Sequence, residues 1–245
     1  MNTTRLIAIF AAVRLCFGQT PADEAARRKK AAESMHAMAS SVLRSAKVIL
    51  DKPYSADTVT RTVQTLADGN TIVRENSGRI YRDRSGRTRR EQKIEAMGPS
   101  SPIAVGSFIV ISDPVAKTDF ILDPARKSLR KFERLETGQD MPKPLGAPRG
   151  EDLGERTIEG LVCHGERRTT TIPAGQMGNA RPLSIVSETW YSSAIDAIVQ
   201  STTHDPRFGD TAYTLRNVTL AEPPANVFHA PADYTIEFEG RRAKP

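Results

Sequence analysis

Cysteine is scarce in this chain of 245 residues: only Cys16 and Cys163 are present. Cys16 lies in an amino-terminal segment that we expect to be removed, which leaves Cys163 alone. A single cysteine cannot form an internal disulfide, so an exported product must be held together by its core. The sequence around Cys163, TIEGLVCHGE, is typical of a strand. We therefore predict that Cys163 is a small buried side chain and not a reactive thiol.

The residue patterns of common catalytic and metal sites are also missing. The four histidines have no metal-ligand spacing, and no serine elbow, paired catalytic carboxylates or nucleotide fingerprint occurs. Cys163 and His164 are neighbours, which places them on opposite faces of a strand. The sequence thus predicts a protein that is not an enzyme and has no metal and no cofactor. An alternative, an envelope hydrolase, would use His204 and Asp205 with Asp210, although THDPRFGDT is foremost a turn.

No apolar run reaches the 20 or so residues that a membrane-spanning helix needs. Residues 1–18 combine an early cation, Arg5, with an apolar stretch from Leu6 to Gly18, which is the layout of a secretory signal peptide. Cleavage after Gly18 would remove two of the 35 basic residues and leave 33 against 29 acidic ones, a net charge of +4. We expect an exported protein, periplasmic or extracellular, that is soluble after cleavage. The basic cluster at 27–30 opposes this interpretation.

A helix is predicted over 21–50, because Thr20, Pro21 and Asp23 form a good helix start and Pro53 ends it. Its apolar residues recur at steps of three and four and share one face. Four of them are candidates for contact with an apolar ligand: Met35, Met38, Val42 and Ile49. The alternative is that they are ordinary core.

After Pro53 the apolar period changes from 3.6 to 2, and turn residues separate the apolar runs. Turns are expected at 68–70, 77–78 and 85–86, and at the Asp-Pro steps of Asp113 and Asp123. The glycines of TTTIPAGQMGNARP indicate a long hairpin connection, and the Pro/Gly-rich stretch 137–152 a long exposed loop or lid. The fold class predicted for residues 19–245 is α+β: one domain with the helix packed on a strongly curved antiparallel sheet, an incomplete barrel of about ten strands.

Residues 78–91, GRIYRDRSGRTRRE, contain six arginines and two acids. A hairpin turning at Ser85-Gly86 would place like charges opposite one another, which favours a solvated strand pair over a binding site. If these arginines bind anything, the candidate is an anionic envelope surface, through Arg82, Arg84, Arg87 and Arg89. A nucleic-acid partner is not expected, because the mature charge is low and export removes the partner.

Three stretches resemble the superfamily of periplasmic lipoprotein carriers of the LolA and LolB type, together with the lipid-sensing domains of RseB-type regulators. These are the order of signal peptide, helix and strand meander, the segment TDFILDPARKSLRKF, and the ending TAYTLRNVTL then NVFHAPADY. The segments TVQTLADGN, GRTRRE, TTTIPAGQMGN and DPRFG are similar to those of uncharacterised exported bacterial proteins, a resemblance that implies no activity.

The carrier resemblance implies an incomplete barrel that encloses an apolar cavity for acyl chains. It therefore implies an exported, non-enzymatic protein that binds an apolar or lipid ligand, or a lipidated partner, between helix and sheet. Aromatic residues are only 6% of the chain, few for lining a large cavity. The alternative function is an envelope protein-interaction or sensor domain of the same fold without a ligand cavity.

Overall fold

The computed structural model describes residue 39 and residues 48–94, 106–134 and 150–241. Within these ranges the regular elements are twelve strands and one short 3-10 helix, η1. The elements run β1 (Tyr54–Thr65), β2 (Thr71–Arg82), β3 (Thr88–Ile94), β4 (Gly106–Asp113), β5 (Thr118–Asp123), β6 (Ser128–Glu133), β7 (Glu151–Ile158), β8 (Leu161–Ile172), β9 (Leu183–Ser192), β10 (Ala197–Asp205), β11 (Gly209–Thr219), η1 (Ala225–Phe228) and β12 (Thr235–Arg241).

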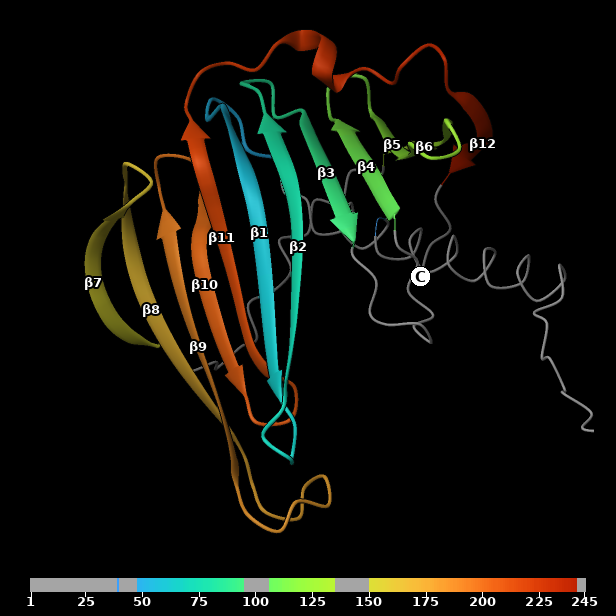
Figure 1. Cartoon of the computed structure of the whole chain (residues 1–245). Helices are drawn as coiled ribbons and strands as arrows, with labels where there is room; N and C mark the ends of the chain where they lie inside the picture. The colour runs from blue at the N-terminus through green and yellow to red at the C-terminus, as the bar shows by residue number, and fades with distance from the viewer. Residues whose placement is uncertain (1–38, 40–47, 95–105, 135–149, 242–245) are drawn as a thin grey trace, which may run out of the picture.

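All twelve strands belong to one sheet, in the order β12-β6-β5-β4-β3-β2-β1-β11-β10-β9-β8-β7. Figure 1 shows that the sheet curves from β7 at one edge to β12 at the other. Two meanders, β1 to β6 and β7 to β11, meet where β1 pairs with β11. β12 then returns to the far edge and pairs with β6 in parallel, whereas every other pair is antiparallel.

The predicted α+β class is wrong: the elements of the described residues are twelve strands and one short 3-10 helix, an all-β sheet. Of residues 21–47, only Ala39 is described, and it is a single helical residue. Most of the predicted helix, 21–50, lies outside the described residues. Residues 48–50, in which Ile49 continues its apolar period, are not helical. They lie against the turn between β2 and β3, where Asp51 has a φ of 57° and its N–H donates to the carbonyl of Arg84 at 2.9 Å.

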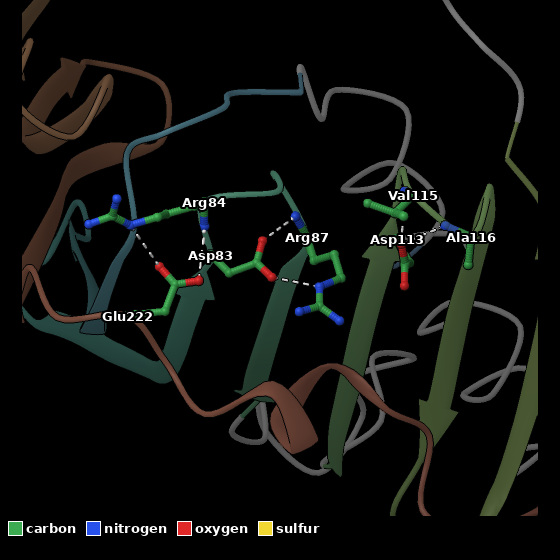
Figure 2. Close-up of polar contacts among 7 residues, drawn as sticks. All are labelled: Asp83, Arg84, Arg87, Asp113, Val115, Ala116 and Glu222. Atoms are coloured by element: carbon green, nitrogen blue, oxygen red, sulfur yellow. Dashed lines mark hydrogen bonds and ion pairs between the residues drawn. The ribbon is translucent and has the colours of Figure 1, made fainter.

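Most of the predicted turns are confirmed. Asp113 and Asp123 each begin a turn, and the side chain of Asp113 accepts the backbone N–H groups of Val115 and Ala116, both at 2.8 Å (Figure 2). This carboxylate satisfies two donors that a turn would otherwise expose to water. Gly175 and Gly178, in the connection between β8 and β9, have φ values of 82° and 81°, as their predicted role requires.

The turn predicted at Ser77-Gly78 is wrong, because β2 runs without a break through both residues. A Cβ atom on Gly78 would overlap the backbone carbonyl of Glu91 on β3 and lie 2.8 Å from the hydroxyl of Thr58 on β1. Glycine is needed here for close packing and not for a turn. Residues 135–149, which make up most of the predicted 137–152 loop, lie outside the described residues, and Glu151 and Asp152 already belong to β7.

Candidate functional site

One face of the sheet can be followed from its register. Leu215, Thr58, Gly78, Gln92 and Phe108 lie opposite one another in a row across β11, β1, β2, β3 and β4. Side chains in register share a face of the sheet. We call this surface the Phe108 face, and the other surface, which carries Ile109, the Ile109 face.

An apolar cluster occupies the Phe108 face toward the β12 edge. Its buried members from the sheet are Ile94, Phe108, Val110, Ile121 and Phe132, with Phe238 packed beside them and Ala39 buried against them. The rings of Phe132 and Phe238 are 5.4 Å apart between centroids. We call these residues the Phe108 cluster. Removing apolar surface from water in this way stabilises the fold by about 25 cal/mol for each Å² buried.

Toward the β7 edge the same face carries hydroxyl side chains. Thr58, Thr60 and Thr62 alternate along β1, opposite Leu215, Tyr213 and Thr211. The hydroxyls of Thr62 and Thr211 are 3.3 Å apart, and those of Ser187 and Thr203 are 3.2 Å apart. Besides these hydroxyls, this side of the Phe108 face carries Arg74, opposite Thr62, and a second buried apolar cluster that includes Ala56, Ile80 and Leu215. The face therefore combines apolar and polar areas, as an amphiphilic molecule does.

A small hollow lies at the border between the apolar and polar areas. It has a volume of about 60 Å³ and is lined by Thr58, Arg79, Ile80, Arg90, Glu91, Gln92, Phe108 and Tyr213. Gly78, between Thr58 and Gln92 in the row, contributes no side chain to fill this region. Burial raises the pKa of Tyr213 to about 12, so its hydroxyl stays protonated at neutral pH and can donate a hydrogen bond.

The four arginines predicted to bind an anionic surface do not form one patch. Arg82 is buried, stacks on the ring of Tyr54, and donates to the carbonyl oxygens of Lys52 and Ile195. Its environment is protein on all sides, and burial lowers its pKa. Arg87 pairs with Asp83, Arg89 with Glu91, and Arg84 with Glu222. Only Arg84 has a mostly exposed side chain, at 71%.

Of the other predicted ligand contacts, Met35, Met38 and Val42 lie outside the described residues. Ile49 is half-buried beside the Gly86 turn, apart from the Phe108 cluster. The sequence interpretation missed Arg90, the last arginine of the hairpin. Arg90 lies on the Phe108 face and has no acidic partner among the described residues. Strand alternation alone could have separated Arg90 from Arg89, but its lack of a partner depends on the tertiary structure.

Two larger grooves lie on the Ile109 face. One, of about 530 Å³, has an apolar base that includes Val59, Ile109 and Pro124, and its charged side chains Asp57 and Arg79 pair with each other. The other, of about 560 Å³, is lined by Arg61, Val63, Val186, Glu188, Thr202, Thr203, His204, Asp210, Thr211 and Ala212. Both are open grooves over exposed strands.

The alternative catalytic residues lie near the second groove. His204 and Asp210 are opposite each other on β10 and β11, with Nδ1 and Oδ1 2.5 Å apart, and both side chains are exposed. Asp205 starts the predicted turn and binds Arg207 instead. No group of three potential metal ligands occurs within the described ranges.

Cys163 is buried, which raises its pKa, whereas His164 is exposed and 3.5 Å from Asp152. Cys163 and His164 therefore cannot act as nucleophile and base.

The pair of Asp205 and Arg207 should make stability depend on pH in acid. Hydrogen bonds from the Arg207 side chain lower the pKa of Asp205 from its ordinary 3.8 to about 2. The pair therefore stabilises the fold fully above about pH 4, and this contribution is lost as the pH falls toward 2. In urea unfolding at several pH values, Asp205→Asn should be less stable than the wild type at pH 6, and the difference should shrink below pH 4. Arg207→Gln should do the same. A difference that stays constant down to pH 2.5 would contradict this account.

None of the described elements is a helix long and apolar enough to cross a membrane. No protein-family model matches the chain. No curated protein matches it either.

Solved structures do match the chain. An uncharacterized conserved protein from Thermus thermophilus matches 82% of this chain and 99% of its own length, with 12% identity and a TM-score of 0.44. A chain of the MucA/MucB complex from Pseudomonas aeruginosa matches 80% of this chain with 13% identity and a TM-score of 0.43, and this chain spans 62% of that one. A LolA superfamily protein from Nitrosomonas europaea matches 78% of this chain and 97% of its own length, with 10% identity and a TM-score of 0.28.

A protein of the LolA superfamily, which the sequence analysis named, is among the solved structures that the chain matches, at low identity and a low TM-score. Likenesses of this extent assign neither a ligand nor an activity to the chain.

Proposed function

We propose that the chain is an exported, non-enzymatic binding protein that holds an apolar or lipid ligand, or a lipidated partner, on the Phe108 face of its sheet. The observation that supports this proposal most is that this face carries both the Phe108 cluster and a hydroxyl-lined part. A ligand with an apolar chain and a polar end would match both parts. Export is proposed from the signal-peptide layout of residues 1–18.

The Phe108 cluster is closely packed, since Phe108, Val110 and Ile121 are all at most 7% exposed. An acyl chain would enter only by separating these side chains and would replace their contacts with its own. For the protein side chains this exchange is nearly neutral in free energy, because they are buried in both states, whereas the acyl chain gains by leaving water. Binding of this kind would favour chains that are long enough to cover all the separated side chains.

Lipid that remains bound through native purification from the envelope fraction is the test. Phe238 lies at the β12 edge of the cluster, so Phe238→Ala should remove apolar contact without opening the centre. We expect acyl lipid in the wild-type mass spectrum and about tenfold weaker retention in the variant, since burial of part of a phenyl ring contributes roughly 1.5 kcal/mol.

Val73→Ala is the matched control. Val73 is 51% exposed and lies on the Ile109 face, in register with Val63. Its truncation should leave lipid retention unchanged. Wild-type protein that carries no lipid and takes up none from vesicles would contradict the proposal.

A second function has one observation in its favour. The hollow on the Phe108 face is small, whereas the groove on the Ile109 face is open and has an apolar base. This geometry would suit an interaction or sensor domain that binds a protein partner without a lipid cavity. Recovery of a defined envelope protein, with no lipid in either species, would select this function over the first.

A further inference from the structure

Arg90 occupies an unusual position for a cation. In register across the sheet it lies between Ile80 on β2 and Val110 on β4, and the same row continues to Ala56 and Ile121. These four neighbours are apolar and at most 7% exposed, while Arg90 itself is exposed. An arginine next to a packed apolar surface is tolerated when its guanidinium has water or an anion to bind.

The other arginines of the same hairpin are all engaged. Arg79, Arg84, Arg87 and Arg89 have carboxylate partners, and Arg82 donates to two backbone carbonyls. Arg90 has neither kind of partner among the described residues. Its chain neighbours Arg89 and Glu91 belong to the Ile109 face and bind each other at 2.7 Å. Arg82, on the Phe108 face, is close enough to interact with Arg90 as a second cation. The positive charge of Arg90 is therefore not neutralised within the part of the chain that the structure describes.

The hollow beside Arg90 is rich in hydrogen-bond donors. Thr58 and Tyr213 contribute hydroxyls, Gln92 contributes an amide, and Phe108 and Ile80 form the apolar wall. Glu91 and Arg79 also reach the hollow, but Glu91 is paired with Arg89 and Arg79 with Asp57. A water molecule needs about 10–15 Å³ on this measure, so 60 Å³ admits a group of a few heavy atoms.

We propose that Arg90, with Thr58, Gln92 and Tyr213, binds the anionic headgroup of an amphiphile whose acyl chain lies on the Phe108 cluster. The headgroup is a phosphate or a carboxylate, because an arginine fork and neutral donors match the oxygens of either anion. This inference rests on the proposed function and names the chemical class of its ligand. Arg90 then fixes which end of the ligand points toward the hydroxyl-lined part.

Calorimetric titration with four oleoyl probes tests the proposal. Oleate carries a carboxylate and oleoyl lysophosphatidylglycerol a phosphate, while oleyl alcohol and monoolein are their neutral counterparts. Wild-type protein should bind each anionic probe at least about tenfold more tightly than its neutral counterpart, the value of one hydrogen-bonded charge contact. The tighter of the two anionic probes identifies the headgroup, and either result supports the proposal.

Arg90→Gln should abolish the anionic preference and leave the neutral probes unchanged, and Arg90→Lys should keep part of it. Arg84→Gln, in the same hairpin but paired with Glu222, should bind like the wild type. Equal wild-type affinity for neutral and anionic probes overturns the proposal while the proposed function stands, and this comparison needs no variant. Failure of all four probes to bind contradicts the proposed function itself.

Discussion

Replacing Asp83 with alanine should lower the free energy of unfolding by about 3 kcal/mol, the lower end for breaking a buried ion pair. The Asp83 side chain is 1% exposed and holds the turn between β2 and β3. It accepts the backbone N–H of Arg87 at 2.8 Å and the Arg87 Nε at 2.5 Å (Figure 2). Alanine would leave two donors without their acceptor, one of them on a partly buried cation.

The neighbouring pair of Arg84 and Glu222 is the control for this prediction. Figure 2 shows both pairs side by side. The Nε of Arg84 and the Oε2 of Glu222 are 3.6 Å apart, and both side chains are largely exposed. Glu222→Ala should therefore cost less than about 1 kcal/mol. Chemical denaturation of both variants provides the comparison. Equal losses for Asp83→Ala and Glu222→Ala would show that burial does not decide the strength of these contacts.

Replacing Gly209 with alanine should cost more than about 2 kcal/mol, because two separate penalties add. Gly209 begins β11 with a φ of 91°, which an L side chain rarely adopts. A Cβ atom there would also overlap the backbone carbonyl of Val63 on the neighbouring strand. Because the obstacle is backbone, relief requires the β1–β11 pairing to shift.

Gly175 separates the two penalties. Its φ is 82°, but no atom lies within 4 Å of the position that a Cβ would take. Gly175→Ala should therefore show the conformational penalty alone, about 1 kcal/mol. Thermal or chemical unfolding of the two variants measures the difference. Equal destabilisation would mean that the close approach to Val63 costs nothing and would contradict this explanation.

Turns could be predicted from the sequence where the residue type at the turn has a single structural role. Asp113 and Asp123 precede proline, and both form the expected turns. Gly78 was misread because glycine serves two purposes, and the sequence does not distinguish a turn from a close approach of strands. Most of the helix predicted over 21–50 lies outside the described residues. Its last positions, 48–50, are not helical, although Ile49 continues the apolar period.

Long-range pairing could not be predicted from the sequence. β1 pairs with β11, and β12 pairs in parallel with β6, between segments about a hundred residues or more apart. The same limit applies to charge. Arg84 is matched by Glu222, 138 residues away, and the Arg89 guanidinium donates to the carbonyl of Val227. These long-range contacts decide which arginine has no carboxylate partner among the described residues. Arg90 could therefore be identified only in the folded chain.

The location of a bound acyl chain tests the central claim most directly. A fatty acid with a diazirine on its chain can be bound, photoactivated and mapped by peptide mass spectrometry. With adducts mapped to single residues, binding on the Phe108 face predicts labelling of Ile94, Phe108 and Val110 and not of Ile109 on the other face of the same strand, with unlabelled oleate competing the adducts away. Adducts confined to β10 and β11 around His204 and Asp210, or to no part of the sheet, would contradict the claim.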